Sequence, residues 1–232
     1  MIINKVTVTG ADDKTDIKLM QQIQKEFSFV EWGILISTNQ GRNRYPNEDF
    51  IFNLKDKNLN LALHVCGKHS RNILSDGIID VKYDFFNRYQ INFNFLNTPH
   101  NLDNWGSLVT TFPDKKFILQ YNLSNDSFIK KIISNTDMSN TNTNILYDSS
   151  GGRGTEIKSI SKPHKDIYTG YSGGLNPDNV DAICEKIFTH KDKSKVWIDM
   201  ESGVRTDDVF DLEKVYKVLK CVDKWINKGF SI

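Results

Sequence analysis

The sequence contains only three cysteines, Cys66, Cys184 and Cys221, and they lie far apart. An odd and widely spaced set argues against a disulfide framework and against a closed four-cysteine zinc site. No run approaches the roughly 18 uninterrupted apolar residues that a membrane span requires, and Met1–Gly10 lacks the apolar core of a signal peptide. We therefore expect a soluble, cytoplasmic protein without a membrane partner.

An excess of charge of either sign is also missing. The 30 basic and 29 acidic side chains leave a formal net charge of +1, so no broad basic field is available for nucleic acid, and none is expected as a partner. With 38% hydrophobic residues, the 232-residue chain can form one sizeable core. We expect a single domain over residues 1–232, as a monomer or homodimer, with a small neutral or anionic ligand.

Short β-rich runs alternate with helical or polar connections, a pattern typical of parallel βα units. The predicted strands are Lys5–Thr9, Glu31–Ser37, Asn60–Val65, Tyr89–Phe93, Phe117–Tyr121, Asn144–Tyr147, Asp166–Tyr171 and Lys195–Asp199. An open doubly wound sheet shows the same alternation, but the dinucleotide-binding glycine fingerprint is absent after the first run. The predicted fold class is therefore α/β, a single (β/α)8 TIM barrel, and no cofactor is expected.

Three connections carry clear helix signals. Asp16–Phe27 and Asp211–Ile226 repeat apolar residues at three- and four-residue steps, which predicts helices with one buried face. Asn176 and Pro177, followed by an acidic residue, form a capping pattern that predicts a helix from Pro177 to about Phe188.

Two glycine-containing loops follow the last two predicted strands. In a TIM barrel the ligand site is built from the loops after the strands, and phosphate often lies between the loops after strands seven and eight. Glycines let the backbone approach an anion, and the first loop leads into the helix predicted at Pro177. Tight turns alone would also explain the glycines. Because both neighbouring loops share this character, we predict a phosphate site formed by Gly173, Gly174, Ser202 and Gly203.

Candidate catalytic side chains lie at the ends of two other strands. Asp148 ends strand six, where a carboxyl group can act as general acid or base, or can only cap the next turn. His64 and Cys66 are two residues apart and so share a strand face, where they can form a basic pair or simply pack in the core. With His69 they would supply only three poorly spaced ligands, so no metal is expected.

Three motifs in the last third of the chain resemble one family. They are Tyr147-Asp148-Ser149 with Gly151-Gly152-Arg153-Gly154, then Gly173-Gly174-Leu175-Asn176-Pro177-Asp178-Asn179-Val180, then Asp199-Met200-Glu201-Ser202-Gly203-Val204. Arg44-Tyr45 and Gln90-Ile91-Asn92 are weaker matches further forward. Together these motifs resemble phosphoribosylanthranilate isomerase. The resemblance implies a (β/α)8 barrel and an Amadori rearrangement, in which an acid opens a furanose ring and a base removes the proton from C2.

The resemblance also implies a role for individual residues. It implies Asp148 as the acid and the two glycine loops as the phosphate site. It implies Arg44 as the partner of the anthranilate carboxylate, and the paired donors of a guanidinium suit two carboxylate oxygens. By position, the further substrate-binding residues are Thr9, Gln90, Asn92 and Arg153.

Two positions depart from the family pattern. Thr9, in Thr7-Val8-Thr9-Gly10, stands where the family has its basic cysteine, and Asn92 replaces a histidine. A threonine hydroxyl near neutral pH cannot accept a proton as a thiolate can, so the family's base is absent. Cys66 beside His64 is a candidate replacement. Asp12 and Asp13 are further candidates, with a solvated loop as the alternative interpretation.

These observations predict a phosphosugar-binding barrel enzyme, an isomerase or lyase acting on a phosphorylated sugar or sugar-amine with an altered general base. A weak phosphoribosylanthranilate isomerase and a non-catalytic barrel that binds a phosphorylated metabolite are the alternatives.

Restoring the family's residue tests whether the missing cysteine limits catalysis. If it does, Thr9→Cys should raise any isomerisation of phosphoribosylanthranilate by roughly 10²–10⁴-fold, the usual contribution of one positioned base. The rate can be followed by NMR. An unchanged rate would mean that the base lies elsewhere in the chain.

Overall fold

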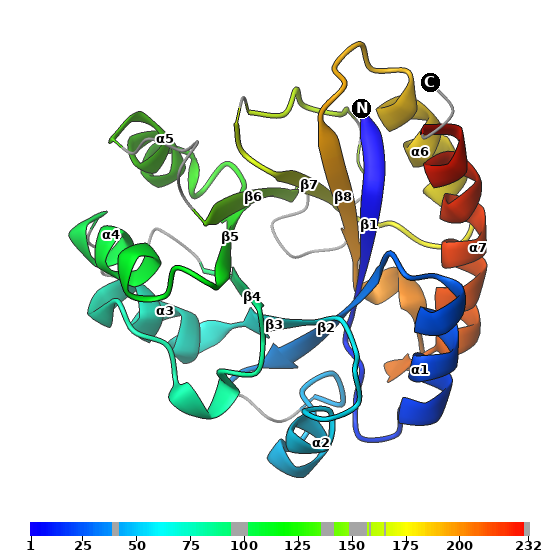
Figure 1. Cartoon of the computed structure of the whole chain (residues 1–232), viewed down its shortest axis with the longest axis horizontal. Coiled ribbons are helices and arrows are strands. Elements are labelled where there is room, and N and C mark those ends of the chain that lie inside the picture. The colour runs from blue at the N-terminus through cyan, green and yellow to red at the C-terminus, as the bar shows by residue number, and fades with distance from the viewer. Residues whose placement is uncertain are drawn as a thin grey trace.

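The computed structural model describes residues 1–38, 42–93, 102–135, 142–148, 157, 159–164 and 166–229. Eight parallel strands form a closed barrel in chain order (Figure 1). The strands are β1 (Ile2–Thr9), β2 (Val30–Ile36), β3 (Leu61–Val65), β4 (Arg88–Ile91), β5 (Lys116–Tyr121), β6 (Thr143–Asp148), β7 (Thr169–Ser172) and β8 (Lys195–Met200). Each overlaps one predicted run, and the predicted fold class, a (β/α)8 barrel, is confirmed.

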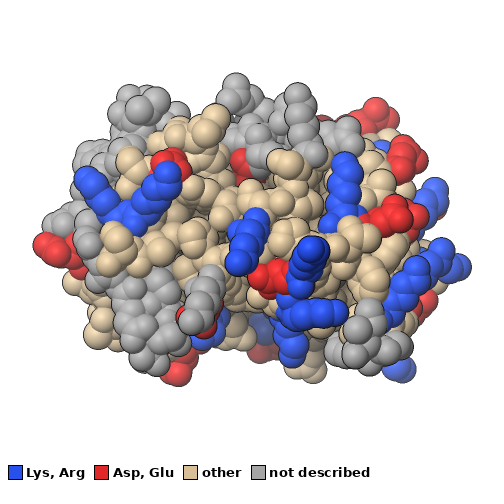
Figure 2. Space-filling view, turned by 90° about the horizontal axis from the view of Figure 1, so that it is seen from above, with Lys and Arg blue, Asp and Glu red and all other residues tan. Residues whose placement is uncertain are grey.

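Helices surround the barrel on its outside (Figure 1). They are α1 (Ile17–Glu26), α2 (Glu48–Asn53), α3 (Gly67–Asp76), α4 (Leu102–Thr111), α5 (Asp126–Asn135), α6 (Val180–Phe188) and α7 (Leu212–Gly229). A small hairpin of β9 (Arg205–Thr206) and β10 (Val209–Phe210) lies between β8 and α7. Within the described ranges, no helix has the length and apolar character to cross a membrane. On the face in Figure 2, basic and acidic side chains are interspersed, in keeping with the near-zero net charge.

The predicted helix signals are mostly confirmed, with one correction. Asp16 caps α1, accepting hydrogen bonds from the amides of Lys18 and Leu19. The helix after β7 begins at Val180, however, and not at Pro177 as predicted. Asn176 Oδ1 accepts hydrogen bonds from the amides two and three residues later, at 2.8 and 3.2 Å. These bonds hold residues 177–179 in a turn that precedes the helix.

Alternation along the strands separates outward from inward side chains. On β8, Val196, Ile198 and Met200 join the large core between barrel and helices. Trp197 instead packs inside the barrel with Ile118, Leu146 and Tyr168. We call these four residues the apolar plug. The indole fits because β7 has a glycine beside it: a Cβ at Gly170 would lie 2.2 Å from the Trp197 ring.

A buried ion cluster lies inside the barrel near the starts of the strands. Glu31 accepts hydrogen bonds from Arg88, from Lys5 Nζ at 2.8 Å and from Thr7 Oγ1 at 2.9 Å. The Arg88 guanidinium also lies 4.7 Å from the centre of the Trp197 ring, a cation–π distance. Burial by itself would raise the pKa of Glu31, but the positive charges of Arg88 and Lys5 outweigh it and lower that pKa below its usual value.

Removing the Glu31 carboxylate should destabilise the barrel in a pH-dependent way. Glu31→Gln leaves Arg88 buried without its counter-ion, which should cost roughly 3–5 kcal/mol of unfolding free energy at pH 7, measured by urea denaturation. Because folding lowers the pKa of Glu31, its contribution is present above the unfolded-state pKa and is lost as pH falls. The difference between wild type and variant should therefore shrink as pH falls below about 5.

Glu48→Gln provides the matched control, since Glu48 pairs with Lys82 on the surface, where both side chains are well exposed. Such pairs contribute about 0–1 kcal/mol. If Glu31→Gln loses no more unfolding free energy than Glu48→Gln, or if its loss is independent of pH, the stabilising role of the buried Glu31 ion cluster would be contradicted.

Candidate active site

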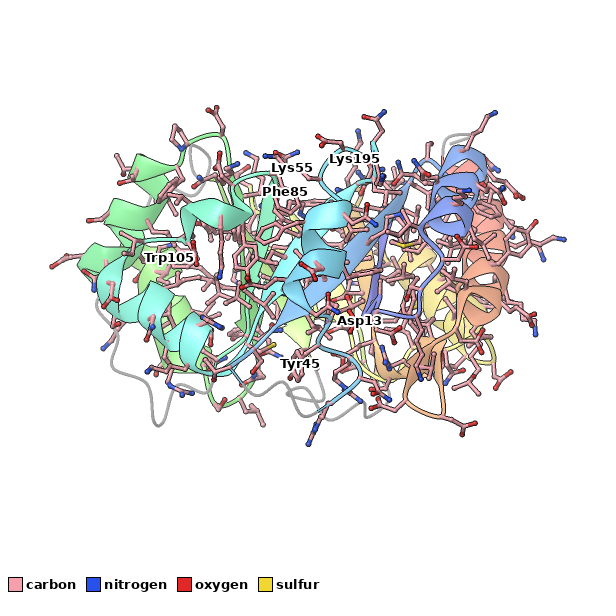
Figure 3. All side chains as sticks on the ribbon, turned by 90° about the horizontal axis from the view of Figure 1, so that it is seen from below. Asp13, Tyr45, Lys55, Phe85, Trp105 and Lys195 are labelled. Carbon is pink, nitrogen blue, oxygen red and sulfur yellow. The ribbon has the colours of Figure 1, made fainter. Side chains whose placement is uncertain are left out.

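The strands end on the side of the barrel where Tyr45 lies, opposite Lys55, Phe85 and Lys195 (Figure 3). We call this side the mouth. Near the strand ends, inward-facing positions carry polar side chains that are at most 8% exposed. They are Thr9 of β1, His64 of β3, Gln90 of β4, Gln120 of β5, Asp148 of β6 and Asp199 of β8. Beneath them the apolar plug fills the barrel, so the polar groups are desolvated from below.

Three strands bring Thr9, Asp199 and His64 together. Thr9 Oγ1 donates a hydrogen bond to Asp199 Oδ1 at 2.9 Å and lies 3.5 Å from His64 Nδ1. Gly33 of β2 leaves the space that this arrangement needs, because a Cβ there would lie 2.3 Å from Thr9 Oγ1 and 3.0 Å from His64 Nε2. Asp199 was not among the site residues predicted from the sequence. Its position two residues after Trp197 on one strand face was the available signal.

The Asp199 carboxyl group is poised to exchange a proton near neutral pH. Burial disfavours its charged form and raises the pKa of Asp199 to about 7. The hydrogen bond from Thr9 lowers this pKa, whereas the nearby carboxylates of Glu201 and Asp148 raise it further. A group with a pKa near the working pH can act as either a general acid or a general base.

Asp148 ends β6 and is 5% exposed. Gln120, on the neighbouring strand β5, donates a hydrogen bond from Nε2 to Asp148 Oδ2 at 2.5 Å. The structure thus places this carboxyl group among the buried polar groups of the mouth. Arg153, which the resemblance implied as a substrate-binding residue, lies outside the described residues.

The predicted pair of His64 and Cys66 is arranged differently from a thiolate–imidazole pair. The Cys66 Sγ lies 4.0 Å from the His64 backbone oxygen and accepts a hydrogen bond from Asn92 Nδ2 at 3.5 Å. Asn92 Oδ1 in turn accepts from Gln90 Nε2 at 3.2 Å. Burial raises the pKa of Cys66 to about 11 and lowers that of His64 to about 3, so near pH 7 both are neutral.

Two polar atoms in this group have no hydrogen-bond partner among the described residues. They are His64 Nε2 and Gln90 Oε1, and both are buried. A ligand that supplies a hydroxyl group would satisfy either atom. Within the same described ranges, no three His, Cys, Asp or Glu side chains come together as a metal site.

The loops after β7 and β8 pack directly against each other. Gly173 and Gly174 have φ values of +132° and +58°, which favour glycine. A Cβ at Gly203 would lie 1.9 Å from the Leu175 backbone oxygen, so only glycine permits this approach. Among the described residues, the amides of Gly173, Gly174, Ser202 and Gly203 donate no loop hydrogen bond.

Arg44 is paired with carboxylates of the chain itself. Its guanidinium contacts Glu201 Oε1 at 2.5 Å and Asp208 Oδ1 at 3.0 Å, which ties the segment after β2 to the segment after β8. The resemblance implied a role in binding the anthranilate carboxylate. A substrate carboxylate would therefore have to compete with these two internal partners.

The two acidic residues after β1 have different environments. Asp12 forms a buried ion pair with Arg205 at 2.9 Å and accepts a hydrogen bond from the Phe210 amide at 3.0 Å, so its carboxylate is fully engaged in structure. Asp13 is exposed and accepts a hydrogen bond from the Asn47 amide at 2.9 Å. The solvated-loop interpretation therefore fits Asp13, whereas Asp12 is buried in an ion pair.

Comparison with known proteins bears on this geometry. Residues 108–221, slightly less than half of the chain, match the family model of N-(5'-phosphoribosyl)anthranilate (PRA) isomerase. The match includes all three motifs that carried the resemblance, and it confirms that resemblance over these residues. No curated protein sequence matches the chain.

Solved structures share the barrel at low sequence identity. The isomerase of the same name from Pyrococcus furiosus has a TM-score of 0.59 at 13% identity, covering 95% of this chain and 98% of its own. A truncated 3-deoxy-D-arabino-heptulosonate 7-phosphate synthase from Thermotoga maritima has a TM-score of 0.58 at 10% identity, covering 98% and 88%. The 3-hexulose-6-phosphate synthase from Salmonella typhimurium has a TM-score of 0.52 at 11% identity, covering 95% of this chain and 99% of its own. These likenesses establish the fold.

A methyl group at Gly203 should separate the two loops. Gly203→Ala would press a Cβ against the Leu175 backbone, and overpacking of this kind costs roughly 1–3 kcal/mol of unfolding free energy. Gly106→Ala in the exposed part of α4 is the control, because nothing lies within 4 Å of a Cβ there. That change should stabilise by up to about 1 kcal/mol through helix propensity. Denaturation curves in which Gly203→Ala is as stable as wild type would contradict the close packing.

Proposed function

We propose that the protein is an enzyme acting on a phosphorylated sugar or sugar-amine at the mouth of the barrel, as an isomerase or lyase. The observation that carries this proposal is the pair of abutting glycine loops, whose amides donate no loop hydrogen bond among the described residues, on the same mouth as two buried carboxyl groups. The first feature suits a phosphate and the second suits proton transfer. Their coexistence at one site is what a phosphosugar enzyme requires.

The proposed phosphate site uses backbone rather than side-chain charge. Consecutive amides in left-handed glycine conformations form a concave donor surface for an anion. Asn179 Nδ2 donates to the Gly174 backbone oxygen at 2.9 Å and so holds the loop in shape. The family model supports this assignment, and two similar structures carry a phosphorylated sugar in their names.

The proposed acid is Asp148, which would donate a proton to the ring oxygen of the sugar and so open the ring. Gln120 holds one carboxyl oxygen of Asp148 at 2.5 Å, which fixes the orientation of the group. The unpartnered Gln90 Oε1 and the neighbouring Asn92 would bind sugar hydroxyls. Arg153 stays a proposed substrate contact. Arg44 would meet a substrate carboxylate only by exchanging Glu201 or Asp208 for it.

A non-catalytic phosphosugar sensor is the second candidate, and it is favoured by Thr9 in place of the family cysteine. The two candidates differ in turnover and not in binding. A phosphosugar that binds at the mouth while phosphoribosylanthranilate and related phosphosugars remain unchanged would favour the sensor.

Charge placed at Gly174 should weaken phosphate binding. Asp and Asn tolerate a φ of +58° better than other residues, so Gly174→Asp and Gly174→Asn form a matched pair that differs in charge. In calorimetric titrations with ribose 5-phosphate, the Asp variant should bind at least about tenfold more weakly than wild type, or about 1.4 kcal/mol. The Asn variant should lose less. Equal affinities in folded proteins, judged by melting curves, would remove the phosphate site and the main support for the proposed function.

A further inference from the structure

The proposed reaction needs a base, and Thr9 occupies the position of the family's basic cysteine. We propose that Asp199 is the general base that removes the proton from the sugar carbon, and that Thr9 acts as a positioning residue for its carboxylate. This inference rests on the proposed function and adds the base that the sequence left open.

The first support is the contact between the two residues. Thr9 Oγ1 donates to Asp199 Oδ1 at 2.9 Å, so the side chain that replaced the cysteine now orients a carboxylate on the adjacent strand. The strands β1 and β8 pair directly, and this pairing fixes the approach of the two side chains. A carboxylate can accept about four hydrogen bonds, so the contact leaves acceptor sites for a substrate proton.

The second support is the enclosure of Asp199. Trp197, two residues earlier on the same strand face, belongs to the apolar plug and fills the barrel below the carboxyl group. Asp199 is 5% exposed. A desolvated carboxylate is a stronger base than one in water, which is the effect that raises the pKa of Asp199 to about 7. Near neutral pH a large fraction of the molecules would then hold the base in its charged form.

The other candidate bases fit less well. The pKa of His64 is lowered to about 3, so its imidazole is a weak base, and its Nδ1 lies 3.5 Å from Thr9 Oγ1. The pKa of Cys66 is raised to about 11, so its thiolate is scarce near neutral pH. Neither burial nor hydrogen bonding makes either group a proton acceptor at pH 7.

The chemistry balances without a cofactor. After ring opening of a phosphoribosyl amine, C1 and the nitrogen form an iminium group. When Asp199 removes the proton from C2, the C2–H electron pair becomes a C1=C2 bond, and the electron pair of the iminium π bond returns to nitrogen. The proton now resides on Asp199. Protonation of C1 and loss of the enol proton give the ketone, so atoms and electrons are conserved.

The test uses Asp199→Asn, which keeps an oxygen acceptor for Thr9 but removes the base. Two probes are followed by NMR: turnover of phosphoribosylanthranilate, and exchange of the C2 proton of ribose 5-phosphate for deuterium in D2O, which requires removal of a proton from the same carbon. We expect wild type to catalyse deuterium incorporation and Asp199→Asn to lower that rate at least about 100-fold. Binding of ribose 5-phosphate, measured by calorimetry, should stay within threefold or so of wild type. Asp56→Asn, exposed and next to Lys55 at the other end of the barrel, is the matched control.

The pH profile separates the candidate bases and tests the role of Thr9. The charged and titratable groups around Asp199 are Asp148, Glu201 and, beyond Thr9, His64. The wild-type exchange rate should rise with pH through about 7, as expected for the pKa of Asp199, whereas His64 would give a limb near 3 and Cys66 one near 11. Thr9→Val removes a hydrogen bond that lowers the pKa of Asp199, so the limb should move to higher pH. A purely structural role for Thr9 would leave the limb in place.

Each remaining outcome is decisive. Wild type that binds ribose 5-phosphate but catalyses neither reaction, or an Asp199→Asn rate within threefold of wild type, would overturn the assignment of the base while leaving the phosphate site intact. Thr9→Cys should not raise the rate, because a base is already present, and a 100-fold gain would overturn the proposal. Failure of wild type to bind any phosphosugar would instead contradict the proposed function, and this inference with it.

Discussion

The packing of the Trp197 indole inside the barrel determines the environment of the polar groups above and below it. An eight-stranded barrel has an interior that side chains must fill. Here Trp197 does so against a glycine, with Ile118, Leu146 and Tyr168 around it. The plug separates two polar regions: the Glu31 ion cluster near the strand starts, and the carboxyl groups of the mouth. Without an apolar layer between them, water or the Arg88 charge would reach Asp199, and its carboxyl group would be an ordinary acid.

Much of this architecture could be predicted from the sequence, because strand alternation and helical periodicity are local patterns. All eight strands were located, and the helices after β1 and β8 were recognised from their apolar steps. The helix predicted to begin at Pro177 begins later, because the Asn176 side chain can stabilise a turn as well as cap a helix, and the sequence does not distinguish the two. Residues of the mouth were found where a motif marked them, as at Asp148. Asp199 was predicted as the last residue of a strand and given no role, although its position two residues after Trp197 placed it on the inward face of the barrel.

Other features depended on contacts between distant segments and could not be predicted. Arg44 meets Glu201 and Asp208 more than 150 positions later in the chain, and Asp12 meets Arg205 across a similar separation. These ion pairs fasten the segments after β1, β2 and β8 to one another. Likewise, the period of two placed His64 and Cys66 on one face, but only the folded barrel shows that burial leaves both neutral near pH 7. Similarly, the sequence showed that Thr9 could not act as the base, but it did not show that Thr9 donates a hydrogen bond to Asp199.

The enclosure of Asp199 has a thermodynamic consequence for the folded chain. In the unfolded protein this carboxyl group loses its proton near pH 4, roughly the ordinary value for aspartate. In the barrel it retains the proton up to about pH 7. Folding in slightly acidic buffer must therefore take up nearly one proton at this position, and the contribution of Asp199 to stability is full below the unfolded pKa and declines as pH rises through the folded one. This trend opposes that of Glu31 at the other end of the barrel. The charged form of Glu31 thus stabilises the fold, whereas the charged form of Asp199 destabilises it. Because unfolding in slightly acidic buffer releases the Asp199 proton to the buffer, the measured enthalpy of unfolding should vary with the ionisation enthalpy of the buffer.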